Sequence, residues 1–302
     1  MFDSIIVGGG CAGLTAAIYL IRAGWRPVVY EAAVTGGQIA VSAEVENYPG
    51  FVKISGPELA GKIADQAREL GVEIRYEPVT ALEVREGENS VITPSGIEHG
   101  RTLILALGAV RRKLSCPGED RLTGAGVSYC ATCDGAFFKG KKVLVVGGGN
   151  TALEDALFLS NVASDVFLVH RRDRFTADRI LTQAVTARSN IALLLDSEVT
   201  EILGETAVSA ARIQNRITGE TRQLDVSGVF IAVGLIPQNG IAEGQLPLDS
   251  RGYFDAGEDC ATSTAGVFVA GDCRRKPLRQ ILTAASDGAV AGWAAAGWLN
   301  EH

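Results

Sequence analysis

The stretch that decides the fold is Gly8-Gly9-Gly10-Cys11-Ala12-Gly13, which has the spacing G-x-G-x-x-G. Residues 3–7 predict a short buried strand before it, and residues 14–23 predict a helix that stops at Gly24. A second strand, 27–30, is followed directly by Glu31. This order predicts a βαβ dinucleotide-binding unit, in which Gly8, Gly10 and Gly13 lie near a pyrophosphate and Glu31 accepts a ribose hydroxyl. A glycine turn in an ordinary α/β unit is the alternative interpretation.

The same design recurs later in the chain, and this repeat is the most informative feature of the sequence. When Gly8 is placed over Gly147, the strand before the glycine turn, the helix after it and the next strand all coincide. The chain is therefore predicted to contain two nucleotide-binding units. The candidate cofactor-binding residues of the second turn are Gly147, Gly149, Asn150, Thr151 and Ala152.

The two units differ where their second strand ends. The first unit has Glu31 at this place and the second has His170-Arg171-Arg172. An acid suits a free 2′-hydroxyl, whereas arginines suit a 2′-phosphate through their charge and fork geometry. The second unit is therefore predicted to bind NADPH through His170, Arg171 and Arg172, and the first to bind a dinucleotide without the extra phosphate. A solvated strand end is the alternative interpretation of the arginines.

A second stretch with evident chemistry is Cys130-Ala131-Thr132-Cys133-Asp134-Gly135. Its two cysteines can close a disulfide that two electrons and two protons reopen. Thiols in such pairs often have a pKa lowered from ~8.5 to ~3.5–7.5, and the thiolate is the reactive form. Asp134 can exchange a proton beside a leaving thiolate. Cys130, Cys133 and Asp134 are thus candidate catalytic residues, and the glycine turn that follows indicates electron transfer between a bound cofactor and the disulfide.

Half of a zinc site is the alternative interpretation of the cysteine pair, but a structural zinc needs about four Cys or His ligands at short spacings. The remaining candidates are scattered singly, so we expect no metal: they are Cys11, Cys116, Cys260, Cys273, His99, His170 and His302. A structural disulfide is also disfavoured, because the N-terminus lacks the basic region of an export signal. In a reducing cytoplasm a disulfide is more often catalytic.

Composition bounds the remaining possibilities. A length of 302 residues suggests about two domains. Hydrophobic residues make up 47% and charged residues 21%, which allows a large core and argues against disorder. A net charge of -7 argues against nucleic acid or an acidic membrane as the main partner. Since no apolar run approaches the ~20 residues of a membrane helix, we expect no membrane partner either.

The segments around the two units predict the domain organisation. Charged residues 110–113 predict a crossing between domains, and a crossing back is expected near 239–244. Residues 202–224 predict a small antiparallel excursion, residues 266–272 a strand ending in Gly-Asp, and residues 278–299 a long helix that contains Arg279 and Gln280. We therefore predict an α/β protein with two Rossmann-like three-layer domains, the second inserted into the first. The predicted bounds are 1–112 with 244–302, and 113–243.

Together these motifs resemble those of the low-molecular-weight thioredoxin reductases, within the FAD-dependent pyridine nucleotide-disulfide oxidoreductases. The resemblance runs nearly end to end. Besides the motifs above it rests on Gly36-Gly37-Gln38, Glu46-Asn47-Tyr48-Pro49-Gly50, Gly271-Asp272 and Arg279-Gln280. It implies FAD in the discontinuous domain, NADPH in the inserted domain, and a homodimer. Among the residues of these shorter motifs, it implies FAD contacts for Gly37, Gln38, Asn47, Asp272, Arg279 and Gln280.

The resemblance also implies a reaction in which electrons pass from NADPH through FAD and the Cys130–Cys133 disulfide to thioredoxin. Cys133 would face the flavin, Cys130 would attack thioredoxin, and Asp134 would manage the proton. Phe137 and Phe138 match apolar residues of the family's thioredoxin-docking surface, although ordinary packing explains them equally well. Family members swing one domain against the other between the two half-reactions, a hinge motion of an ordinary kind.

Two positions depart from the family's pattern. Thr176 stands where the basic motif continues to a further arginine, and Arg174 lies two residues earlier. One contact to the 2′-phosphate is therefore expected to be missing or relocated. Leu107 replaces a usual threonine in Ala106-Leu107-Gly108, which we expect to change the polarity near the flavin without abolishing FAD binding.

Three other functions remain open from the sequence. Reduced ferredoxin could replace NADPH as the electron donor, for which Thr176 is the only support, and NADH remains a further possibility. A flavin-dependent oxidase of small dithiols would need no nicotinamide site. A flavin-bound redox sensor would need an output module, which the sequence does not supply.

Overall fold

The computed structural model describes residues 1–42 and 44–302, which form two compact units. The first comprises Met1–Val110 and Ile236–His302, and the second comprises Arg111–Leu235. Glycines and prolines in residues 36–51 predict a loop, and residue 43 within it lies outside the described part of the chain. Within that part, no helix is both long and apolar enough to cross a bilayer.

The first unit is built on a sheet with the strand order β3-β2-β1-β6-β5-β4, and β17 also pairs with β6. Strands β1, β2, β3, β6 and β17 are parallel, whereas β4 and β5 form an antiparallel extension. Parallel neighbours need crossover connections, and here helices supply them. The strands are β1 (Phe2–Val7), β2 (Pro27–Glu31), β3 (Glu73–Tyr76), β4 (Ala81–Glu83), β5 (Asn89–Thr93), β6 (Gly96–Leu105) and β17 (Val267–Val269).

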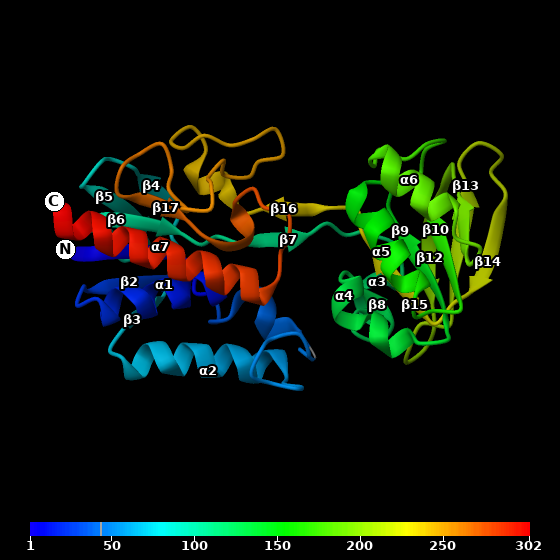
Figure 1. Ribbon diagram of the computed structural model, residues 1–302, viewed down its shortest axis with the longest axis horizontal. Coiled ribbons are helices and arrows are strands. Elements are labelled where there is room, and N and C mark those ends of the chain that lie inside the picture. Colours follow the sequence, from blue (N-terminus) through cyan, green and yellow to red (C-terminus); the bar gives the residue numbers. More distant parts are fainter. Residues whose placement is uncertain (43) are drawn as a thin grey trace. The chain divides into compact units, whose positions relative to one another are not determined.

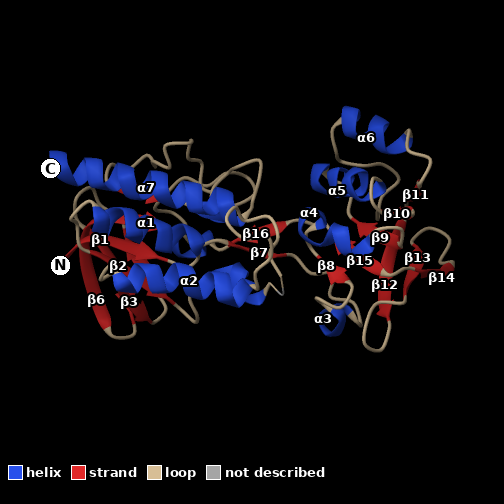
Figure 2. Ribbon diagram, turned by 60° about the horizontal axis from the view of Figure 1, so that its bottom comes forward, coloured by secondary structure: helices blue, strands red, loops and turns tan. Residues whose placement is uncertain are grey.

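Helices α1 (Cys11–Arg22), α2 (Gly56–Glu69) and α7 (Ile281–Glu301) cover one face of this sheet (Figures 1 and 2). Because side chains alternate along a strand, Ile6 packs under the helices while Ile5 packs on the opposite face, against Leu246 and Phe254. Small residues let α1 and α7 approach closely. A Cβ on Gly288 would lie 2.1 Å from the Ala12 carbonyl oxygen.

The second unit has a fully parallel sheet with the order β11-β10-β9-β15-β8. Helices α5 (Asn150–Ser160) and α6 (Arg179–Thr186) pack on one face. The predicted antiparallel excursion, β12 (Ser197–Leu203), β13 (Ala210–Asn215) and β14 (Thr221–Asp225), packs on the other. The parallel strands are β8 (Val127–Ser128), β9 (Lys142–Val146), β10 (Asp165–Val169), β11 (Ile191–Leu194) and β15 (Gly228–Ile231). This confirms the prediction of two three-layer α/β domains, the second inserted into the first.

The repeat seen in the sequence is also a repeat of backbone geometry. Gly8 has φ 108° and Gly147 has φ 153°, values that L side chains rarely adopt. A Cβ on Gly8 would lie 2.3 Å from the Ala106 carbonyl oxygen, and one on Gly147 would lie 2.4 Å from that of Ala232. Each turn thus passes against the exit of the neighbouring strand at a distance that only glycine allows.

The chain crosses between the units through two short strands, β7 (Ala109–Arg111) and β16 (Leu235–Pro237), which pair with each other. The second crossing was predicted near 239–244 but lies earlier in the chain. The reason is that 3₁₀ helix η3 (Asn239–Ala242) already packs in the first unit. There Ala242 is buried, and the Asn239 amide donates to the carbonyls of Gly252 and Cys273 at 2.9 and 2.8 Å.

Candidate functional site

The cysteine pair closes a disulfide at the start of a helical turn in the second unit. Cys130 is the extended N-cap of α4 (Ala131–Asp134), and its Cα lies 5.3 Å from that of Cys133. The Cys130 carbonyl accepts hydrogen bonds from the backbone N–H groups of Cys133 and Asp134 at 3.3 and 3.1 Å. One helical turn therefore fixes the backbone positions of both cysteines and of Asp134 relative to one another.

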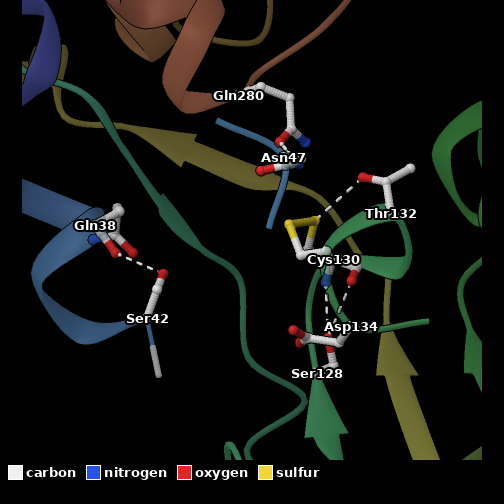
Figure 3. Close-up of a disulfide and its surroundings, with 9 residues drawn as sticks. Gln38, Ser42, Asn47, Ser128, Cys130, Thr132, Asp134 and Gln280 are labelled. Atoms are coloured by element: carbon white, nitrogen blue, oxygen red, sulfur yellow. Dashed lines mark hydrogen bonds between the residues drawn. A yellow bond between two sulfur atoms is a disulfide. The ribbon is translucent and has the colours of Figure 1, made fainter. Parts of the chain in front are cut away.

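Asp134, the predicted proton-handling residue, is bound by a serine that precedes the pair (Figure 3). Ser128 Oγ lies 2.5 Å from Asp134 Oδ2, and Figure 3 shows the two side chains pointing toward each other. Ser128 Oγ also lies 3.1 Å from the Cys130 backbone nitrogen and 3.3 Å from the Cys130 carbonyl oxygen. Thr132 Oγ1 lies 3.4 Å from Cys130 Sγ. The acid is thus tied to the backbone of the disulfide.

The two phenylalanines after the pair have different surroundings. Phe137 is 45% exposed, as a docking residue needs to be. Phe138 is buried and packs edge-on against Phe230 with ring centroids 5.1 Å apart. The suggestion that Phe138 lies on a docking surface is therefore wrong, because its ring fills the core beside Gly228.

In the first unit, Gly10 and Gly37, two of the predicted FAD residues, lie together at the N-terminus of α1. Gly10 is the N-cap of this helix, with no side-chain cap and no acid in the first turn. Its free N–H groups suit a pyrophosphate. Gly37 packs against Gly10, since a Cβ on Gly37 would lie 3.5 Å from the Gly10 Cα. Leu107 packs on the far face of the sheet.

Glu31 already organises the glycine turn. Its Oε2 accepts the Gly9 N–H at 2.8 Å, and its Oε1 accepts the Ala33 N–H at 3.0 Å. Each carboxylate oxygen can accept a further hydrogen bond, so a ribose hydroxyl remains compatible with these contacts.

The Gly-Asp turn, η4 (Gly271–Cys273), is fixed against α1 and α7. A Cβ on Gly271 would lie 3.0 Å from that of Ala12, which places Asp272 beside the start of α1. The Gly271 N–H donates to Asp287 Oδ2 on α7 at 2.9 Å. Asp287 is buried with Arg274 and Lys276, which bind its carboxylate at 2.7 and 2.8 Å. This buried ion cluster holds the turn in place.

Arg279 and Gln280 precede α7 and do not lie within it, which corrects the sequence prediction. Gln280 is an extended N-cap that exchanges hydrogen bonds with Thr283, so the helix begins at Ile281. Asn47 Nδ2 donates to Gln280 Oε1 at 3.1 Å. Arg279 binds the carbonyls of Asp272, Arg274 and Lys276 and lies over the Tyr253 ring. The side chain of Gln38 is exposed on η1 (Gly37–Val41).

In the second unit, the ring of His170 lies directly against the glycine turn. A Cβ on Gly148 would lie 2.1 Å from its Nδ1. Burial lowers the pKa of His170, which keeps the ring neutral at physiological pH. Its Nε2 is buried and has no hydrogen-bond partner among the described residues. A neutral imidazole with one nitrogen available suits a ribose hydroxyl, which can donate to it.

The loop after His170 folds back over the same turn. Thr176 donates to the Gly148 carbonyl through both its N–H at 2.8 Å and its hydroxyl at 3.1 Å. Asn150 and Asp178 exchange two hydrogen bonds at 2.7 and 2.9 Å. The Thr176 hydroxyl is therefore already bound to the glycine turn. The exposed cations of this segment are Arg171, Arg172 and Arg174.

The other four cysteines carry free thiols. Burial raises the pKa of Cys11, Cys116 and Cys273 to about 11 and that of Cys260 to about 12. These thiols stay protonated at physiological pH, and the thiolate is the nucleophilic form. Cys11, Cys260 and Cys273 are buried, and Cys116 is half-buried.

Sequence reasoning missed several residues that support the site. Ser128 lies two residues before the cysteine pair, where a serine at a strand end commonly caps the next turn. Asp287 had a clearer signal, because α7 has no other acid between Ile281 and Asn300. Asp178 had no local signal, since its contact with Asn150 is set by tertiary folding.

Two nucleotide-binding units with a disulfide in the second define a class of protein that exchanges electrons between a dinucleotide and a pair of thiols. The profile of the pyridine nucleotide-disulphide oxidoreductases matches residues 2–288, and this chain belongs to that family. It is therefore an oxidoreductase.

Individual relatives are more specific. The thioredoxin reductase of Mycolicibacterium smegmatis is 44% identical over 302 residues, which cover 99% of this chain and 97% of that protein. The bifunctional thioredoxin reductase/thioredoxin of Mycobacterium leprae is 42% identical over 99% of this chain and 66% of its own length. The crystal structure of thioredoxin reductase from Streptococcus pyogenes matches with a TM-score of 0.94 at 40% identity, covering 100% and 99% of the two chains.

Proposed function

We propose that this chain is a thioredoxin-disulfide reductase in which electrons pass from NADPH through FAD and the Cys130–Cys133 disulfide to thioredoxin. The observation that carries the proposal is that disulfide, with Asp134 directly after it, in the same unit as the second glycine turn. The named relatives, which align with 99–100% of this chain, support the same assignment.

FAD fits the first unit, where the uncapped N-terminus of α1, the Glu31 carboxylate and the Gly-Asp turn lie together. When bound, FAD would supply the two-electron carrier between the nicotinamide and the disulfide. The assignment of Gln38 and Arg279 to FAD rests on the family resemblance alone. The residues assigned to FAD are Gly8, Gly10, Gly13, Glu31, Gly37, Gln38, Asn47, Asp272, Arg279 and Gln280.

NADPH fits the second unit, where α5 also begins at a glycine N-cap without a side-chain cap. Since Thr176 is bound to the Gly148 carbonyl, we assign the 2′-phosphate to Arg171 and Arg172, with Arg174 as the relocated third cation. The residues assigned to the rest of the nucleotide are Gly147, Gly149, Asn150, Thr151, Ala152 and His170.

For the disulfide we assign the nucleophile toward thioredoxin to Cys130, the sulfur facing the flavin to Cys133, and the proton to Asp134. A helical turn that fixes the three residues supports this division of roles, because thiol exchange needs a proton donor or acceptor close to the leaving sulfur. Phe137, with its exposed ring, is the residue we assign to thioredoxin docking.

The remaining partners are also proposals. We infer a homodimer from the family resemblance. We also infer no nucleic-acid partner and no membrane partner, consistent with the net charge of -7. We place the reaction in the cytoplasm, where the four free thiols would persist.

Anaerobic titration of the flavin-loaded protein with NADPH tests the proposal. Two equivalents are expected to reduce both the flavin and the disulfide, because each takes up two electrons, and thioredoxin is expected to reoxidise the enzyme. Bleaching of the flavin only by reduced ferredoxin, or turnover of small dithiols with oxygen in place of thioredoxin, would contradict it.

Replacing the assigned nucleophile sharpens this test. The Cys130→Ser protein should keep flavin reduction by NADPH and lose at least about 10³-fold in thioredoxin turnover, because the nucleophile is absent. Cys116→Ser is the matched control, since that thiol is protonated and lies outside the proposed machinery. Normal thioredoxin turnover by Cys130→Ser would show that Cys130 is not the nucleophile.

A further inference from the structure

Ser128 joins three parts of the redox segment. It ends strand β8, where it pairs with Phe230 of β15, and its side chain is only 5% exposed. From this fixed position its hydroxyl reaches the backbone of Cys130 and the side chain of Asp134. The sheet thus fixes a hydroxyl between the disulfide backbone and the proposed proton-handling acid.

The hydroxyl has two acceptors within reach but only one proton to donate. Its oxygen accepts the Cys130 N–H at 3.1 Å. Its O–H group can then donate either to Asp134 Oδ2 at 2.5 Å or to the Cys130 carbonyl at 3.3 Å. The shorter contact has the length typical of an O–H bond to a carboxylate. An ionised Asp134 therefore accepts the hydrogen bond of the Ser128 hydroxyl. A protonated Asp134 can donate to Ser128 instead, which turns the hydroxyl toward the Cys130 carbonyl.

We propose that Ser128 is a positioning residue that holds the Asp134 carboxyl at the disulfide and reverses its hydrogen bond whenever Asp134 gains or loses a proton. This inference rests on the proposed function, because it concerns how the disulfide is protonated during that reaction.

The proton balance is simple. Opening the disulfide breaks the S–S bond with two electrons, which the proposed activity supplies, and leaves two sulfurs that take up two protons. Asp134 gives one of these protons, so that its O–H bond breaks and an S–H bond forms, and solvent gives the other. The Ser128 hydroxyl then turns from the Cys130 carbonyl to the new carboxylate. Reoxidation of the dithiol returns the proton to Asp134 and turns the hydroxyl back.

Infrared spectroscopy of the full flavin-loaded chain, reduced with dithiothreitol, tests the inference without NADPH or thioredoxin. The carboxyl band of Asp134, identified by its loss in Asp134→Asn, is followed as a function of pH. Removing the donor from the carboxylate favours the protonated acid, so Ser128→Ala should move the midpoint of this band upward by about one pH unit. Ser128→Thr keeps the hydroxyl and should leave the midpoint within about 0.3 units of the wild type, well below the one-unit value of a lost charged bond.

Ser197→Ala is the matched control, because Ser197 is a buried serine of the same unit that donates to the Leu195 carbonyl at 2.7 Å. It should leave the midpoint unchanged. Ser128→Gly provides a second hydroxyl-free variant, and its midpoint should move as in Ser128→Ala. An unmoved midpoint in the hydroxyl-free variants, or an equal shift in Ser128→Thr, would overturn the inference.

A kinetic readout separates this inference from the proposed function. Ser128→Ala should lower kcat for thioredoxin about tenfold with little change in KM, and should add less than about twofold in an Asp134→Asn background. An undiminished additional loss in that background would overturn the inference. If the wild type fails to reduce thioredoxin but the infrared midpoint still shifts in Ser128→Ala, the proposed function is contradicted and the role of Ser128 is supported.

Discussion

Gly148 shows how little space separates the second glycine turn from the strand end that follows it. A Cβ at Gly148 would lie 2.1 Å from His170 Nδ1, whereas one at Gly149 would meet only Thr176 Oγ1, at 3.9 Å. Because His170 is buried against Phe175 at a centroid distance of 5.5 Å, its ring has little freedom to move away. The neighbouring glycines of one motif are therefore not equivalent.

We expect Gly148→Ala to destabilise the second unit by about 1–3 kcal/mol, as overpacking of a fixed neighbour does. Gly149→Ala, the matched control, should cost less than about 1 kcal/mol, since its methyl group meets only ordinary contacts. Urea unfolding of both variants without nucleotide measures the difference. Equal losses would mean that the His170 ring yields to the new methyl group.

At the scale of elements, the buried cluster around Asp287 joins α7 to the Gly-Asp turn. The Asp287 carboxylate accepts hydrogen bonds from the Gly271 N–H, from Arg274 and from Lys276. The side chains of Asp287, Arg274 and Lys276 are almost completely buried. Burial on its own raises the pKa of Asp287, but the hydrogen bonds and charges of Arg274 and Lys276 more than offset it, so the pKa is lowered. The turn therefore depends on one ionised carboxylate.

Asp287→Asn should destabilise the first unit by about 3–5 kcal/mol at pH 7, because it leaves two buried cations without their counter-charge. A carboxyl whose pKa is lowered by folding stabilises the folded state at pH values above its unfolded-state pKa of about 3.9. This contribution is lost as the pH falls through the folded-state pKa. The difference between wild type and variant should therefore shrink below about pH 4.

Urea unfolding at pH 7 and at pH 3.5, followed by circular dichroism, measures this pH dependence. Asp65→Asn is the control, since Asp65 forms an exposed ion pair with Arg68 that contributes about 0–1 kcal/mol. A loss for Asp287→Asn that is the same at both pH values would show that the ionised carboxylate is not what stabilises the turn.

The predicted elements differ in how well local pattern defines them. The sequence predicts a strand at 27–30 and, from a helical pattern, a helix at 56–70. The structure has them at 27–31 and 56–69, because apolar spacing and a Ser55 cap mark them locally. The start of α7 was placed too early, since the sequence does not show that Gln280 acts as a cap. The turn α4 was not predicted at all, as four residues give no periodic signal.

At the scale of the molecule, two similar units were assigned different cofactors from one difference at a strand end, Glu31 against His170-Arg171-Arg172. Hydrogen exchange of the full chain tests this assignment. FAD added to the flavin-free protein should slow exchange in residues 8–14 and 271–273. NADP⁺ should slow exchange in residues 147–153 and 170–176.

A ligand at 100 times its Kd stabilises its unit by about 2.7 kcal/mol, so amides that exchange through opening of that unit should slow about 100-fold. NAD⁺, which lacks the 2′-phosphate, should protect the second unit less at the same concentration. Protection of residues 8–14 by NADP⁺ would contradict the assignment.

The sequence by itself determined the repeated βαβ design, the inserted domain and the redox pair, because glycine spacing, apolar runs and paired cysteines are local patterns. Tertiary structure alone decided which neighbours support them. Ser128 meets Asp134, Asp287 binds the Gly271 turn and Phe138 enters the core because strands and helices distant in the chain bring these groups together. Hydrogen bonds and packing depend on distance in space, and the order of residues along the chain does not give that distance.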